Sequence, residues 1–112
     1  MPETVKVSDV GDGVLFAHIA SGTVDAQGIA AQAGLRLMGF SVTEDAAAAA
    51  AAEIILRHGT AATDAELFGI NLIANESKQM FFEAGGIATA GGIFVDRVAG
   101  QTKLTIYYKI IV

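Results

Sequence analysis

The sequence predicts an all-β fold, an antiparallel β-sandwich or jelly-roll-like domain of about seven to eight short strands. Short apolar stretches recur between glycine-bearing turns along most of the chain. Residues 102–112 alternate in character, and one face of this segment carries Leu104, Ile106, Tyr108 and Ile110. Such closely spaced strands and turns are typical of sandwiches and barrels, not of folds in which strands alternate with helices.

The first 13 residues predict an extended N-terminal arm, and residues 14–112 predict a single β-sandwich domain, which suits a chain of 112 residues. Gly11-Asp12-Gly13 would close the arm in a turn. We expect the arm either to lie across a neighbouring subunit or to be a partly disordered terminus. The start, Met1 to Thr4, lacks the basic and apolar regions of a signal peptide, so we expect synthesis in the cytoplasm.

The remaining strands follow in order along the chain. Residues 21–34 are small and rich in glycine, which predicts a long connection or a weak edge strand. Apolar runs bounded by turn residues predict strands at residues 14–20, 35–43, 53–58, 66–74, 78–83 and 93–98.

Three of these strands carry more specific expectations. In residues 35–43 we expect Met38, Phe40 and Val42 on one face, with Gly39 marking a bulge or a close approach. Both faces of residues 66–74 are fairly apolar, which predicts a central or doubly covered strand. The turn at 99–101 predicts that the last two strands pair as a hairpin.

Residues 45–52 contain seven consecutive alanines, and here two local rules conflict. Alanine is the best helix former, which favours a helix. A helix of two turns is marginal by itself, however, and this one would offer no large side chain to a core. We therefore favour a loop of small residues that leads into a strand, with Ile54 and Leu56 inward and Ile55 outward.

Two copies of Gly-Gly-Ile, at residues 85–87 and 91–93, suggest backbone with positive φ and close packing. Large apolar side chains near these glycines and in the preceding strands are the candidates for core or contact positions. Core is the expected place for each aromatic residue among them. The candidates are Ile55, Phe81, Phe82, Ile87, Ile93 and Phe94.

The composition indicates that the protein functions by associating with other subunits. The apolar fraction is 53%, and no apolar run reaches the roughly 18 residues of a membrane helix. A small domain cannot bury so much apolar surface alone, so we expect a homo-oligomer. The net charge of −5 and the absence of a Lys/Arg cluster argue against direct binding of nucleic acid.

No motif predicts catalysis, a cofactor or a metal ion, so we expect a protein that is not an enzyme. There is no cysteine, and His18 and His58 lie in no catalytic motif. Asp9 and Asp12 lack the closing glutamate of a calcium loop, and their segment is better explained as a turn. The acidic pair Asp64 and Glu66 is what any solvated loop can carry.

The order of features over about two thirds of the chain resembles small virion proteins of tailed phages. The resemblance lies in Leu-Arg-Leu-Met-Gly-Phe-Ser-Val-Thr-Glu at residues 35–44, the alanine-rich stretch with Ile-Ile-Leu-Arg-His-Gly-Thr, and Gly-Gly-Ile-Phe-Val at residues 91–95. It implies a β-sandwich or jelly-roll module that decorates or cements a capsid, or sits in the tail, often as a trimer or higher ring. No catalytic residue is carried over from such proteins.

The leading expectation is therefore a structural virion protein, made in the host cytoplasm, that forms a trimer and binds a major capsid protein or another virion protein. The alternative is a tail-associated or cell-surface module that recognises a receptor or a carbohydrate. A concave surface lined by Tyr107, Asn71 and Asp64 would favour that alternative, although aromatic residues are scarce.

Overall fold

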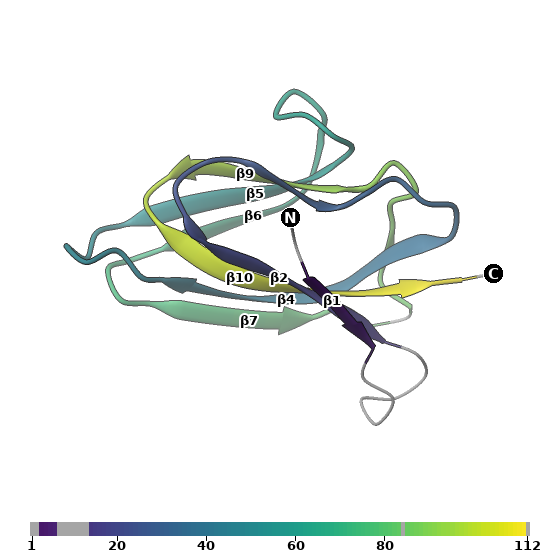
Figure 1. Ribbon diagram of the computed structural model, residues 1–112, viewed down its shortest axis with the longest axis horizontal. Coiled ribbons are helices and arrows are strands. Elements are labelled where there is room, and N and C mark those ends of the chain that lie inside the picture. Colours follow the sequence, from purple (N-terminus) through teal and green to yellow (C-terminus); the bar gives the residue numbers. More distant parts are fainter. Residues whose placement is uncertain (1–2, 7–13, 84, 112) are drawn as a thin grey trace.

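The protein is an antiparallel β-sandwich in which two sheets pack face to face (Figure 1). A computed structural model describes residues 3–6, 14–83 and 85–111. In chain order the strands are β1 (Glu3–Lys6), β2 (Leu15–Gly22), β3 (Ala26–Ile29), β4 (Leu35–Glu44), β5 (Ala52–His58), β6 (Ala65–Leu72), β7 (Ser77–Phe81), β8 (Ile87–Ala88), β9 (Ile93–Ala99) and β10 (Thr102–Ile110). The described residues contain no helix that could cross a membrane.

The strand order is that of a jelly roll. One sheet contains β2-β10-β4-β7 and the other contains β3-β9-β5-β6, so the chain changes sheet at most connections. Two short strands extend the first sheet, because β1 pairs with β2 and β8 pairs with β4. The eight strands of these two orders confirm the predicted fold class. We refer below to the six-stranded sheet and the four-stranded sheet.

Aliphatic side chains from both sheets fill the space between the layers. Alternate residues of β4, β5, β9 and β10 point inward, as the period of two in a strand requires. The largest side chains buried there are Leu35, Leu37, Phe40, Ile54, Leu56, Ile93 and Ile106. Phe68 and Phe82 extend this core as half-buried rings against Phe40.

A bulge in β4 changes which residues face the core. Tyr107 lies opposite Gly39, but the next residue, Tyr108, lies opposite Leu37, so Met38 is the extra residue. The bulge predicted near Gly39 is therefore present. Phe40 and Val42 share the inward face as predicted, but Met38 does not, because the extra residue takes Met38 out of the inward row and puts Leu37 into it.

The predicted hairpin of the last two strands is also wrong. β9 pairs with β3 and β5, whereas β10 pairs with β2 and β4 in the other sheet. The turn at Gly100 thus carries the chain across the sandwich. Gly100 has a φ of 80°, and a Cβ there would lie 2.8 Å from the carbonyl oxygen of Ala51, so the turn requires glycine.

Three further expectations meet the structure as follows. β6 lies at the edge of its sheet and is not a central strand. Residues 46–51 form no helix and lead into β5, as the loop alternative predicts, with Ile54 and Leu56 buried. Within the predicted arm, residues 3–6 form β1 and pair with β2 of the same chain. The predicted Gly11-Asp12-Gly13 turn, with Asp9 and Asp12, lies outside the described residues.

Candidate functional site

The six residues predicted as core or contact positions fall into different environments. Ile93 is fully buried in the core. Phe82 and Ile87 are half-buried and pack against that core. Ile55 and Phe94 are half-buried on the outward side of the four-stranded sheet, the side predicted for Ile55. Phe81 is not a core residue, since 53% of its surface is exposed on the six-stranded sheet.

Both histidines are held by threonines. His18 Nδ1 lies 2.8 Å from Thr105 Oγ1 on the six-stranded sheet. His58 Nδ1 lies 2.9 Å from Thr89 Oγ1. The buried Thr89 hydroxyl donates to the carbonyl oxygen of Gly92 at 2.7 Å, so it accepts from His58. Because the Thr89 hydroxyl already donates its proton to a backbone carbonyl, His58 is not placed as a base toward it.

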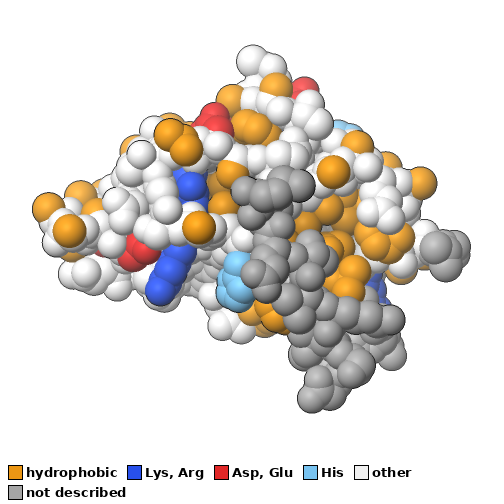
Figure 2. All heavy atoms as spheres, viewed as in Figure 1, with side chains coloured by type: hydrophobic (Ala, Val, Ile, Leu, Met, Phe, Trp, Pro, Cys, Tyr) orange, Lys and Arg blue, Asp and Glu red, His pale blue; other side chains and the backbone are white. Residues whose placement is uncertain are grey.

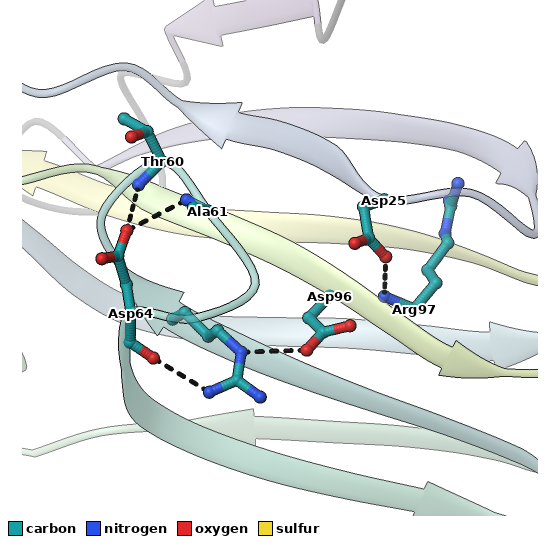
Figure 3. Close-up of polar contacts among 7 residues, drawn as sticks. Asp25, Thr60, Ala61, Asp64, Asp96 and Arg97 are labelled. Carbon is teal, nitrogen blue, oxygen red and sulfur yellow. Dashed lines mark hydrogen bonds and ion pairs between the residues drawn. The ribbon is translucent and has the colours of Figure 1, made fainter.

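The loop between β5 and β6 is organised by Asp64 (Figure 3). The Asp64 carboxylate accepts hydrogen bonds from the backbone N–H groups of Thr60 at 2.8 Å and Ala61 at 3.0 Å. Arg57 donates to the Asp64 carbonyl oxygen and forms an ion pair with Asp96 at 2.9 Å. Asp64 therefore stabilises a turn, which is the role that an acidic residue commonly has in a loop.

The most unusual surface is one end of the sandwich, which we call the apolar tip. Here four connections meet: β2 to β3, β4 to β5, β6 to β7 and β9 to β10 (Figure 1). In Figure 2, separate hydrophobic side chains lie among other atoms at this end. Val24 is 71% exposed, Ile73 is 70% exposed and Val98 is 49% exposed. The tip consists of Val24, Ala47, Ala48, Ala49, Ala50, Ala51, Ile73, Ala74, Val98 and Ala99.

Two buried charged side chains build the tip from inside. The first is Arg97, which points inward from β9 and is 8% exposed. Its guanidinium donates to the carbonyl oxygens of Ala20 at 2.7 Å, Val24 at 3.1 Å and Thr102 at 3.0 Å. Asp25 Oδ1 accepts from the backbone N–H of Arg97 at 2.8 Å (Figure 3). Arg97 thus joins the two sheets and fixes the connection that carries Val24.

The second buried charge is Glu44, the last residue of β4, which is 2% exposed. Its carboxylate accepts from the backbone N–H groups of Asn75 at 2.7 Å and Ala46 at 2.9 Å. The backbone N–H of Glu44 donates to the carbonyl oxygen of Glu76 at 2.9 Å. Glu44 therefore ties the alanine loop to the β6–β7 connection beside Ile73.

The surroundings lower the pKa of both groups, which favours the charged form of Glu44 and disfavours the charged form of Arg97. The hydrogen bond from the Asn75 N–H, followed by the one from Ala46, lowers the pKa of Glu44 below its usual value. Burial lowers the pKa of Arg97, against the opposing effect of the nearby Asp45 and Asp25 carboxylates. An arginine remains charged even so. Both side chains are therefore ionised at neutral pH.

A row of aromatic rings crosses the outer face of the six-stranded sheet. Phe16 of β2 lies opposite Tyr107 of β10, with ring centroids 6.3 Å apart. Tyr107 lies opposite Gly39 of β4, and Gly39 lies opposite Phe81 of β7. The Phe81 and Tyr107 rings meet above Gly39 with centroids 5.0 Å apart. We call Phe16, Tyr107 and Phe81 the aromatic row.

A polar groove of about 340 Å³ lies on the same face, next to the aromatic row. It runs over β2, β10 and β4 and contains hydroxyl groups and two basic side chains. Its polar lining consists of His18, Ser21, Ser41, Thr43, Lys103 and Thr105. The predicted set of Tyr107, Asn71 and Asp64 is not brought together, because Asn71 and Asp64 belong to the four-stranded sheet and its loop.

No protein-family model matches the sequence, no curated protein is similar to it at a significant level, and no solved structure matches the fold significantly. Within the described part of the chain, His, Asp and Glu residues form no group of three that could hold a metal ion. The candidate site therefore consists of the two surfaces described above, the apolar tip and the outer face with its groove.

Arg97, Glu44 and the tip were not predicted from the sequence. A signal was present, since Arg97 follows Val95, and Glu44 follows Val42, at the spacing of two that places residues on one face of a strand. A charged residue at the inward end of an apolar row indicates a buried, hydrogen-bonded group. The glycine at position 39 likewise indicates a close approach, which in the structure is that of the Phe81 ring.

Proposed function

We propose that this chain is a non-enzymatic structural virion protein, which forms a trimer and binds the capsid lattice of a tailed phage as a decoration or cement protein. The observation that carries the proposal is the apolar tip. Exposed aliphatic side chains from separate connections gather there around a loop of alanines. Exposed aliphatic side chains at one end of a domain indicate a surface for protein association.

Buried hydrogen bonds hold the connections of the tip in place, which supports its role as a docking surface. Glu44 and Arg97 fix its connections by hydrogen bonds at 3.1 Å or less. Burying charged groups is costly, and these hydrogen bonds offset the cost, although Arg97 Nε has no partner among the described residues. A loop that only links two strands needs no such support. Because the tip is ordered before binding, little conformational entropy is lost when a partner covers it.

The chemistry of the tip also suits a lattice partner. Alanine side chains are short, so they let another backbone approach closely and lose no rotamer freedom on burial. A subunit that binds the assembled shell, and not free capsid subunits, stabilises the shell by mass action. The resemblance in residues 35–44 and 91–95 and the jelly-roll fold, which capsid proteins and lectins share, agree with this role.

The test is co-sedimentation with heads of the phage that encodes the chain, together with the molar mass in solution by light scattering. The wild type should band with the heads and have the mass of a trimer at micromolar concentration. Val24→Asp with Ile73→Asp places charges on the tip, so this double variant should fail to band with the heads. Phe81→Ala, which alters an exposed apolar residue outside the tip, is the matched control and should band normally.

Three results would contradict the proposal. A monomeric wild type would contradict the proposed trimer. Wild type that stays at the top of the gradient would contradict the proposed binding to the capsid lattice. Normal banding of the folded double variant would remove the tip as the contact surface. Circular dichroism shows whether each variant is folded.

A further inference from the structure

We propose that the outer face of the six-stranded sheet binds an acidic polysaccharide, a chain of sugar rings that carry carboxylate groups. This site is separate from the apolar tip and would be free on a protein docked through that tip. Three features of the face support the proposal: the aromatic row, the hydroxyl-lined groove beside it and the distribution of charge.

The aromatic row offers a platform for sugar rings, whose faces of C–H groups pack on aromatic rings. Phe81 is more than half exposed, although it is large and apolar. The row crosses four neighbouring strands, which corresponds to about 14 Å from β2 to β7. Gly39 makes this possible, since a Cβ at residue 39 would lie 2.9 Å from Phe81 Cδ1. The face is thus shaped to present rings side by side.

The groove continues the platform along β10 with groups that suit sugar hydroxyls. Ser41, Thr43 and Thr105 contribute hydroxyls that can both donate and accept. His18 lies on the same face, with its Nδ1 engaged by Thr105. An aromatic platform with polar groups beside it can hold the face of one sugar ring and the hydroxyls of the next.

The charge of the face selects an acidic chain. The protein carries a net charge of −5, yet the described outward side chains of β2, β4, β7 and β10 include no aspartate or glutamate. Their charged members are all basic: Arg36, Lys103 and Lys109, with His18 beside them. β1 of the same sheet adds Glu3, which pairs with His18, so basic residues still outnumber acidic ones among the outward positions of the described strands and attract an acidic ligand.

The spacing of the basic groups favours a polysaccharide over a nucleic acid. Lys103 and Lys109 are separated along β10 by about 20 Å, and Arg36 is engaged by the Gly85 and Gly86 carbonyl oxygens. Single-stranded nucleic acid needs a groove with closely spaced positive charges that follows its backbone. Sparse basic groups between hydroxyls and rings match a chain whose charges are carried by individual sugars.

The test is isothermal titration calorimetry with oligomers of polygalacturonate as the probe. Dextran oligomers of similar length serve as the neutral comparison and oligothymidylate as the nucleic-acid comparison. The wild type should bind polygalacturonate with a Kd below about 1 mM and should bind it more weakly as salt increases. Neither comparison ligand should bind measurably.

Two variants assign the site. Phe81→Ala should weaken binding about tenfold through the loss of one ring, and Lys103→Gln should weaken it severalfold and reduce its dependence on salt. Ile73→Ala, on the apolar tip, is the control and should bind as the wild type does. The proposal fails if polygalacturonate does not bind, if dextran or oligothymidylate binds as well, or if the folded Phe81→Ala variant binds unchanged.

Discussion

Arg97 Nη2, from the four-stranded sheet, donates a hydrogen bond of 3.0 Å to the carbonyl oxygen of Thr102, the first residue of β10 in the six-stranded sheet. The bond spans the connection at which the chain changes sheet. Because Arg97 also binds the carbonyl oxygens of Ala20 and Val24, one side chain holds three backbone segments that are distant in sequence.

Arg97→Leu should destabilise the fold strongly. The change leaves three carbonyl oxygens without their donor, which we expect to lower the free energy of unfolding by about 3 kcal/mol. Arg57→Leu removes the ion pair with Asp96, which is more exposed than the contacts of Arg97. This change should lower the free energy of unfolding by about 1 kcal/mol. Urea unfolding followed by circular dichroism measures both, since the chain has no tryptophan. Equal losses in the two variants would contradict the role assigned to Arg97.

Glu44 should make stability depend on pH. Its pKa is lowered in the fold, so its contribution is fully present above the unfolded value of about 4.5 and is lost as the pH falls through the folded pKa. Glu44→Gln should therefore destabilise most at neutral pH, and the gap to the wild type should close in acid. Glu53→Gln, on the outward side of β5, is the control. A gap that does not change with pH would contradict the prediction.

Gly39→Ala should displace β7. A Cβ at residue 39 would lie 2.4 Å from the Met80 carbonyl oxygen, and this backbone atom cannot move alone. We expect a loss of about 2 kcal/mol in unfolding free energy. At Gly69, in edge strand β6, the nearest atom to a Cβ is the flexible Glu66 carboxylate at 3.2 Å. Gly69→Ala should thus change thermal unfolding little, and a larger effect there than at Gly39 would refute the assignment.

Ile93→Ala and Ile55→Ala separate core from surface among the residues that the sequence grouped together. Ile93 is fully buried, so its truncation leaves a cavity and should cost about 3 to 4 kcal/mol. Ile55 is half-buried on the outward side, and its truncation should cost about 1 kcal/mol. Denaturant unfolding of the two variants tests the difference, which would be absent if both side chains belonged to the core.

Local pattern was sufficient to predict most strands but not their partners. The alternation of Leu104, Ile106 and Tyr108 places one face of β10 inward, as it does in the structure. The turn before β10 looks the same whether it joins neighbours in one sheet or crosses to the other. The hairpin was wrong for this reason, because the choice between the two depends on distant strands.

Burial was harder to predict for single side chains. Phe81 was expected in the core because aromatic residues usually are, but the register of β7 against Gly39 turns its ring outward. The apolar tip could not be predicted, because alanines raise the mean hydropathy of the sequence without indicating where they lie in the fold. Its members come from separate connections, which only the jelly-roll topology brings to one end.

The position of β10 between β2 and β4 has a consequence for how the molecule forms. β10 is synthesised after all the other described strands, but it is a central strand, so β2 and β4 have no partner between them until β10 pairs. Until β10 pairs with both of them, β2 and β4 each present an unpaired edge, and the sandwich cannot close. Closure of the six-stranded sheet is therefore a single late event in the folding of the described residues.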